Sequence, residues 1–298
     1  ANNFLQLNKC KYDKKININS IKLPVNHWIY NEFVLTQNLV TKSLEIFRFD
    51  EAAKHIYQFV WHYYCDWYLE FLKPIFNSKN KAKLNEARLF SSFMMSNILK
   101  LLHPFIPFFT ETVWGKNNYK KLTKTNLILS NWPEYKTMSK FKKNCTEINN
   151  LIEFISSIRS SKSELKITPK LYCDIHFLEK SSKLNKIIQN NLILAKHVGR
   201  IGNILKSKKI DNNTIEILSQ NEKISLNFNE NIDLVSQKMR ISQKIENLNK
   251  QINALKNKLK NKAYINNAPK EIVQNDKKLL KELTIEDGKL RSIVSSIN

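Results

Sequence analysis

The hydrophobic pattern is strongest between residues 47 and 74, where apolar side chains recur at the spacing of an α-helix. The stripe consists of Ala53, Ile56, Val60, Tyr63, Trp67 and Phe71, and it is widened by Ala52, Tyr57, Phe59, Tyr64 and Tyr68. Asp50 is a suitable N-cap for this helix, and Pro74 is expected to close the other end. Because so few positions are polar, the pattern predicts the central helix of a bundle.

Two long helices are predicted to flank this central helix. The first covers about 24–46 and begins with Pro24, a residue suited to the first helical turn, and the second covers about 81–102. A short helix after Pro107 and an extended segment at 127–133 follow. Together these elements predict an up-down helical bundle of about 110 residues. The Lys-rich stretch 135–144 is interpreted as a linker.

The pattern changes beyond this linker. A helix at about 148–161 is followed by alternating apolar and polar positions at 170–178, 213–219 and 223–228, which predict strands. Another helix is predicted at 184–197. These elements indicate a small α/β module.

The last 67 residues carry the most regular spacing in the chain. Apolar residues separated alternately by four and three positions are Ile241, Ile245, Leu248, Ile252, Leu255 and Leu259. A second helix begins near Pro269, and its stripe contains Ile272, Leu279, Leu283, Leu290, Ile293 and Ile297. Two helices of matched length predict an antiparallel coiled-coil hairpin, an arm of about 40 Å. A coiled coil that dimerises with another chain is the alternative. The expected fold is therefore mainly α.

Charge adds a candidate partner to this picture. The chain has 49 basic and 26 acidic residues, a net charge of +23, which favours a polyanion such as nucleic acid. The excess is spread over every region, and the abundance of Lys, Asn and Ile is also what a strongly AT-biased genome would produce. Charge alone leaves both explanations open.

Cysteine usage and hydropathy indicate the compartment. Cys10, Cys65, Cys145 and Cys173 are far apart and form no C-x-x-C pair, so a zinc site or a disulfide framework is not expected. No apolar run is long enough for a transmembrane span, and no N-terminal signal is present. We expect a soluble, cytoplasmic protein with no membrane partner. Since the chain begins at Ala1, we expect it to be a piece of a longer protein.

Candidate catalytic chemistry is sparse. His62, Asp66 and Glu70 share one helix face at a spacing that could bind a metal, but the flanking helices offer no Glu-x-x-His pair to complete such a site. With only four glycines, phosphate-binding loops are not expected, and Gly199-Arg-Ile-Gly202 is no dinucleotide fingerprint. We predict no catalytic residue and no metal site.

Binding is the remaining chemistry, because basic side chains interleaved with aromatics suit nucleic acid. The candidate contact residues are Trp28, Arg48, Phe49 and Lys73 near the ends of bundle helices and Lys256, Lys258, Lys260 and Lys262 beside the hairpin tip. For any single aromatic, core packing is the favoured role.

Several motifs carry a family resemblance. The segment 48–74, RFDEAAKHIYQFVWHYYCDWYLEFLKP, resembles the anticodon-binding bundle of the valyl-tRNA synthetases. NHWI at 26–29, with His27 where the family has Arg, and HPFIPFFTETVW at 103–114 match in order, as do Trp132-Pro133, Ile158-Arg159 and Ile167-Thr168-Pro169. The segment 257–280, NKLKNKAYINNAPKEIVQNDKKLL, resembles the terminal arm that distinguishes this family from the isoleucyl and leucyl relatives.

The resemblance covers nearly the whole chain and implies its function. It implies the tRNA-binding part of a class I ligase that joins valine to tRNA-Val using ATP. The catalytic and editing domains of the same polypeptide would lie outside this chain, so the chain alone is expected to be inactive and to need no cofactor, while ATP serves the full-length enzyme. The expected oligomeric state is a monomer.

Four regions follow from pattern and resemblance together. They are the tail of a preceding region and a loop at 1–23, a helical anticodon-binding domain at 24–142, a small α/β linker module at 143–231 and a coiled-coil tRNA-binding arm at 232–298. Two alternatives stay open at this point. One is a non-catalytic helical protein that binds RNA or pairs through a coiled coil, and the other is the same region of a related class I synthetase.

Overall fold

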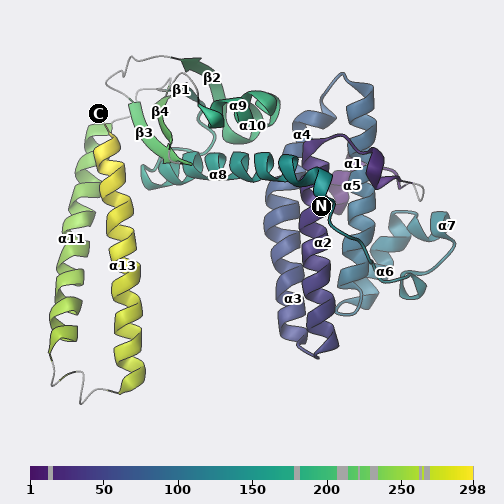
Figure 1. Cartoon of the computed structure of the whole chain (residues 1–298), viewed down its shortest axis with the longest axis horizontal. Helices are drawn as coiled ribbons and strands as arrows, with labels where there is room; N and C mark the ends of the chain where they lie inside the picture. Colours follow the sequence, from purple (N-terminus) through teal and green to yellow (C-terminus); the bar gives the residue numbers. More distant parts are fainter. Residues whose placement is uncertain are drawn as a thin grey trace. The chain divides into compact units, whose positions relative to one another are not determined.

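The computed structural model of the chain describes residues 1–12, 16–177, 182–206, 214–220, 222–228, 234–261, 264 and 269–297. They form two compact units, Ala1–Ile152 and Glu153–Asn298 (Figure 1). The fold is mainly helical with one small sheet, as predicted. Helix α8, Lys142–Glu164, starts where the predicted domain boundary lies and runs on past the division between the units. The four-part division stays a prediction.

The first unit is a helical bundle. Its long helices are α2 (Pro24–Glu45), the composite helix made of α3 (Phe49–Gln58), η2 (Phe59–Tyr68) and α4 (Leu69–Phe76), and α5 (Lys81–Leu102). The shorter elements are α1 (Asn2–Leu7), η1 (Ile18–Ser20), α6 (Pro107–Lys116), α7 (Tyr119–Thr123), η3 (Leu127–Leu129) and η4 (Ser139–Phe141). Helices α2, α3 and α5 lie side by side (Figure 1), as the hydrophobic pattern predicts.

The middle of the central helix is not α-helical. Between α3 and α4, the ten residues of η2 form a π-helix, whose hydrogen bonds run from residue i to residue i+5. Buried positions therefore advance by five here instead of by three or four. Phe59 and Tyr64, which are five apart, are both buried, and Tyr68 follows four residues later.

This π segment corrects the predicted core stripe. Val60, Tyr63 and Trp67, which were expected to lie at its centre, are only half-buried. Tyr64 and Tyr68, expected at its margin, are completely buried. A strict 3.6-residue period cannot represent the wider turn, so beyond Phe59 it selects the wrong side of the helix.

Both predicted ends of the central helix also differ from the structure. Arg48 is the N-cap residue, and Asp50 lies in the first turn, where its carboxylate binds Arg48 instead of capping the helix. Pro74 lies inside α4, which continues to Phe76.

A buried hydrogen-bond chain joins the three long helices. The hydroxyl of Tyr68 donates to Oδ1 of Asn26 at 2.9 Å, and Nδ2 of Asn26 donates to Oε1 of Glu86 at 2.9 Å. The Glu86 carboxylate also accepts from the backbone N–H groups of Lys22 (3.0 Å) and Leu23 (2.8 Å). Backbone N–H groups at a helix start have no partner within the helix, so α5 supplies the carboxylate at the start of α2.

The predicted linker is part of the bundle. Its Tyr135 ring packs against Phe33 (6.3 Å between centroids) and Phe93 (5.6 Å), and Phe141 is buried. Tyr30 donates to the carbonyl of Lys136 at 3.2 Å. The absence of large aliphatic residues suggested a linker, but aromatic side chains anchor this segment instead.

His27 on α2 joins this segment to the bundle. Its Nε2 donates to the carbonyl of Ile21 (2.8 Å), its Nδ1 accepts from Nδ2 of Asn144 (2.6 Å), and its ring stacks on Phe141 with 3.8 Å between centroids. Burial lowers the pKa of His27 below its ordinary value. The neutral imidazole is therefore the form that fits this site.

The second unit contains a four-stranded sheet with strand order β2-β1-β4-β3. The strands are β1 (Cys173–Phe177), β2 (Ile201–Lys206), β3 (Thr214–Ser219) and β4 (Glu222–Phe228). Strands β1 and β2 are parallel and are connected through α9 (Lys183–Asn190) and α10 (Leu192–Gly199), while the other pairs are antiparallel. The three predicted strands are confirmed. The single helix predicted at 184–197 is divided into the two helices α9 and α10.

Strand β2 was not predicted, and its pairing with β1 depends on a glycine. A Cβ on Gly202 would lie 2.3 Å from Oδ1 of Asp174. That oxygen accepts from the backbone N–H of Asn203 at 2.7 Å. Glycine at this position lets the two strands approach each other.

The C-terminal helices α11 (Leu234–Lys260) and α13 (Lys270–Ser296) form the predicted antiparallel hairpin (Figure 1). Lys258 pairs with Asp276 (2.9 Å) near the turn, and Lys244 pairs with Glu286 (2.7 Å) farther from it. On the first helix the predicted Ile241, Ile245, Leu248 and Ile252 are buried. On the second helix Val273 is buried in place of the predicted Ile272, which is exposed.

The π register predicts that truncating either of two adjacent tyrosines lowers the free energy of unfolding by different amounts. Tyr64→Ala should lower the free energy of unfolding by about 3–5 kcal/mol, because it empties a fully buried site. Tyr63→Ala, the matched control, should cost roughly 1–2 kcal/mol. Urea denaturation followed by tryptophan fluorescence measures both values. Equal losses would contradict the register described above.

The buried neutral His27 predicts a pH dependence of stability. Because its pKa is lowered by folding, the unfolded state binds the proton more readily, and stability falls as the pH drops below the ordinary histidine value. We expect the free energy of unfolding to decrease between about pH 7.5 and about pH 5.5 by more in the unaltered chain than in His27→Gln. Denaturation at several pH values tests this, and parallel curves for the two proteins would refute it.

Candidate nucleic-acid interface

The turn between α2 and α3 exposes two aromatic rings and one guanidinium. Phe47, in the left-handed region with φ 59°, is 78% exposed, and Phe49 is 55% exposed. Their ring centroids are 6.4 Å apart in an edge-on arrangement. Exposed rings of this kind can stack on unpaired bases.

Arg48 lies between these two residues in the sequence, and its side chain is held in place by two acids. Its guanidinium contacts the carboxylates of Asp50 at 3.0 Å and Glu51 at 2.8 Å. The hydrogen bond from Arg48 lowers the pKa of Asp50 to about 2. The guanidinium is therefore oriented, while its charge is largely compensated.

The other two bundle candidates lie elsewhere. Trp28 is 0% exposed, and its Nε1 donates to Oδ1 of Asn149 at 2.7 Å, so it cannot stack on a base. This corrects its predicted role. Lys73 lies near the far end of the composite helix, roughly 35 Å along the axis from Arg48, and its Nζ is 2.5 Å from Glu70. Of the four predicted residues, only Arg48 and Phe49 come together.

A second exposed aromatic pair was missed by sequence reasoning. Tyr57 and Trp61 are 63% and 54% exposed, and their rings are nearly parallel, with an interplanar angle of 8° and 6.2 Å between centroids. Tyr57 was expected in the core. The i, i+4 spacing of two aromatics was a visible signal, but only the tertiary structure shows that this side of the helix faces solvent.

The predicted lysines of the arm fall into two classes. Lys258 binds Asp276 at 2.9 Å and lies 4.6 Å from the ring centroid of Tyr264, and its hydrogen bond to Asp276 raises its pKa. Lys256 and Lys260 are exposed and share one helix face at i, i+4 spacing. Of these three lysines, Lys256 and Lys260 are the better candidates for phosphate contacts. Lys262 lies outside the described residues.

Several groups of the described residues that could carry catalysis are engaged or inert. His62 pairs with Asp66 at 3.7 Å, and Glu70 binds Lys73. Burial raises the pKa values of Cys145 and Cys173 to about 11, so these thiols stay protonated and are poor nucleophiles at neutral pH. In the part of the chain that the structure describes, no three His, Cys, Asp or Glu side chains gather closely enough to hold a metal ion.

Within the described ranges, no helix combines the length and the apolar character needed to cross a membrane.

Known families match both units of the chain. Residues 26–177 match the family described as the anticodon-binding domain of tRNA ligase, which covers more than half of the sequence. The chain belongs to this anticodon-binding family. Residues 233–298 match a second family, the valyl tRNA synthetase tRNA binding arm. The resemblance stated from the sequence is thus confirmed.

Curated relatives of this anticodon-binding chain are similar over its whole length. The valine–tRNA ligase of Pelagibacter ubique is 36% identical over 93% of this chain and 31% of the relative. Those of Bartonella quintana and Agrobacterium fabrum are 29% and 27% identical over 97% and 100% of this chain, and 32% and 31% of the relatives. The chain therefore spans about a third of the length of the curated relatives it matches.

The contrast between Trp28 and Phe49 gives a test of their roles. Trp28→Phe should lower the free energy of unfolding by about 1–3 kcal/mol, because it removes the Nε1 hydrogen bond and opens a small void. Phe49→Ala should change it by less than about 0.5 kcal/mol, because the ring is exposed. Thermal and urea denaturation measure both, and the opposite ranking would overturn this assignment.

Proposed function

We propose that this chain is the tRNA-binding part of a valine–tRNA ligase and that it recognises tRNA-Val. The main support is that two family matches follow one another in a single chain. Residues 26–177 match an anticodon-binding family, and residues 233–298 match a tRNA-binding-arm family. The net charge of +23 supports a polyanionic ligand.

The bundle is proposed to read the anticodon loop. Its unpaired bases can stack on the exposed rings of Phe47 and Phe49, and on the parallel pair Tyr57 and Trp61. Arg48, oriented by its two carboxylates, would donate to a base edge or a phosphate beside these rings. Recognition of single-stranded loops by stacking and edge contacts suits this combination of residues.

The arm is proposed to contact the outer corner of the L-shaped tRNA. Lys256 and Lys260 would approach backbone phosphates, while Lys258 and Asp276 keep the two helices of the hairpin together. Two modest contacts on one rigid ligand act together through effective concentration, and they orient the acceptor end of the tRNA.

The remaining steps are proposed to take place outside this chain. Catalytic and editing domains of the same polypeptide would carry out ATP-dependent valylation and its proofreading, so that this chain alone binds tRNA without activity. We propose a cytoplasmic monomer. The pairing of α11 with α13 supports this state, because each helix already buries apolar residues against the other.

Filter binding of the full 298-residue chain to a tRNA-Val transcript at several salt concentrations tests the proposal. Affinity should fall steeply with salt because Lys and Arg displace counterions from phosphates. The double variant Lys256→Gln/Lys260→Gln should make the slope of log K against log salt less steep by about 1–2. Each lost phosphate contact accounts for about 0.7–0.9 of this slope.

The matched control removes the same charge from the same unit. Lys183→Gln with Lys186→Gln alters two exposed lysines of α9 and should leave affinity nearly unchanged. An equal loss in both double variants would refute a specific role for the arm, and the absence of tRNA binding by the unaltered chain would refute the function itself.

A further inference from the structure

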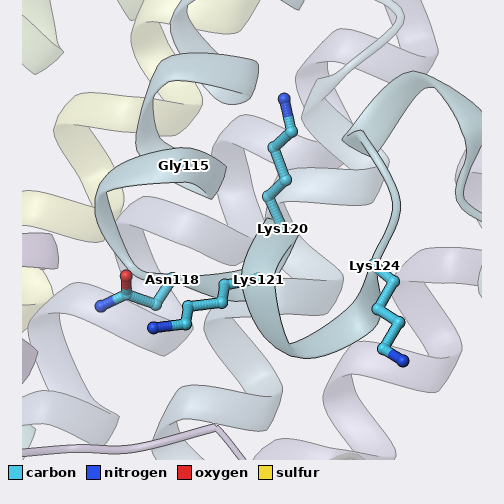
Figure 2. Close-up of a pocket in the computed structure, with 5 residues that line it drawn as sticks. All are labelled: Gly115, Asn118, Lys120, Lys121 and Lys124. Atoms are coloured by element: carbon cyan, nitrogen blue, oxygen red, sulfur yellow. The ribbon is translucent and has the colours of Figure 1, made fainter.

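A lysine-lined pocket lies between α6 and α7 of the first unit, away from the residues assigned above. Gly115, Asn118, Lys120, Lys121 and Lys124 line it, and its volume is about 460 Å³; it is called the α7 pocket below. Figure 2 shows Lys121 extending beside Asn118 and Lys120 rising on the side of Gly115, while Lys124 leaves in another direction. All five residues are exposed, so the pocket is open to a large ligand.

The positive charge of the α7 pocket is not compensated. Between Glu111 and Glu134 the sequence contains four lysines and no acidic residue. The Glu111 carboxylate is already used, since it accepts from the backbone N–H groups of Leu127 (3.0 Å) and Ile128 (3.2 Å). Across the described ranges, none of the three pocket lysines forms an ion pair, unlike Arg48 and Lys258.

The backbone under these lysines is firmly anchored. The buried Tyr119 hydroxyl donates to the carbonyl of Ser92 at 3.1 Å, and its ring packs 4.9 Å from that of Trp114. Trp114 Nε1 donates to the carbonyl of Thr125 at 3.2 Å, and the Thr123 hydroxyl donates to the carbonyl of Tyr119 at 2.7 Å. Helix α7 is therefore a fixed platform from which flexible lysine stems can adjust to a ligand.

We propose that the α7 pocket binds a phosphate group of the tRNA backbone. The ammonium groups of Lys120 and Lys121 and the amide of Asn118 are hydrogen-bond donors, and phosphate oxygens are acceptors. Gly115 leaves room for the ligand, because a Cβ built there meets no atom within 4 Å.

The lining also selects the kind of phosphate. It contains no aromatic or aliphatic residue that could hold a free base or an acyl chain. A polymer whose other parts bind elsewhere suits such an open site, which is lined by lysines, an asparagine and a glycine. The inference rests on the proposed tRNA-binding function, and it adds a contact that positions the RNA without reading its sequence.

Charge removal with a matched control tests the α7 pocket. In the full chain, the triple variant K120Q/K121Q/K124Q should bind a tRNA-Val transcript roughly three- to tenfold more weakly and reduce the slope of log K against log salt by about 1. The control K79Q/K81Q/K83Q removes the same charge from three exposed lysines at the start of α5, and it should have little effect. Equal effects in the two triples would overturn the proposal.

Gly115 offers a second pair of variants that differ in charge but hardly in size. Gly115→Glu places a carboxylate at the pocket, whereas Gly115→Gln places a neutral amide there, and neither meets a steric obstacle at Cβ. Gly115→Glu should weaken tRNA binding severalfold relative to Gly115→Gln. Indistinguishable affinities would count against a phosphate at this site.

Lysine-reactive labelling read by mass spectrometry gives a test without substitution. The transcript should protect Lys120 and Lys121 of the unaltered chain, and inorganic phosphate at the same phosphate concentration should not. Equal protection by both would reduce the pocket to a general anion site and overturn the RNA proposal. If the unaltered chain binds no tRNA, both this inference and the proposed function fail. If the unaltered chain binds tRNA, and K120Q/K121Q/K124Q and Gly115→Glu bind it equally well, only the inference about the α7 pocket fails.

Discussion

The five-residue step from Phe59 to Tyr64 determines how the bundle is assembled. Because a π-helix rotates less per residue than an α-helix, Tyr64 and Tyr68 enter the core below Phe59, while Trp61 faces solvent beside Tyr57 at the end of α3. Tyr68 then reaches Asn26, and through it Glu86, whose carboxylate accepts from the backbone N–H groups of Lys22 and Leu23 just before α2. One local change of helical pitch thus sets the interior contacts of the second half of this helix. π-helical turns occur often at functional sites, and here the turn also presents an aromatic pair.

The exposed cations divide according to whether a carboxylate accompanies them. Arg48, Lys73 and Lys258 are each bound to an acid within 3.0 Å, which orients them and compensates their charge. Surface ion pairs contribute little to stability, so their main consequence is geometric. Among the described residues, the lysines of the α7 pocket and Lys256 and Lys260 of the arm form no ion pair, and their field is available to a polyanion. Net charge alone could not make this distinction, because it counts both classes equally.

The small sheet provides the base of the hairpin within the second unit. Ile215 of β3 forms a bridge with Ile297 just after α13, and Nζ of Lys238 on α11 donates to the carbonyl of Ile297 at 2.9 Å. Arg240 on α11 donates to the carbonyl of Glu164 at the end of α8 at 2.8 Å. Both helices of the hairpin are therefore attached to the module by their ends, which leaves the lysines toward the turn free to meet a ligand.

The sequence by itself determined the helices of the bundle, three of the four strands, the antiparallel hairpin and the family, because local periodicity and motif order depend only on neighbours along the chain. It did not determine the π register, since a 3.6-residue period cannot represent a wider turn. It also missed β2, whose ladder with β1 depends on a partner 28 residues away at Cys173 and on the small size of Gly202. The sequence left Trp28 a candidate contact residue, whereas in the structure its Nε1 donates to Asn149, on a helix far along the chain. Burial and ion pairing are decided by contacts between distant segments, and only the tertiary structure brings those segments together.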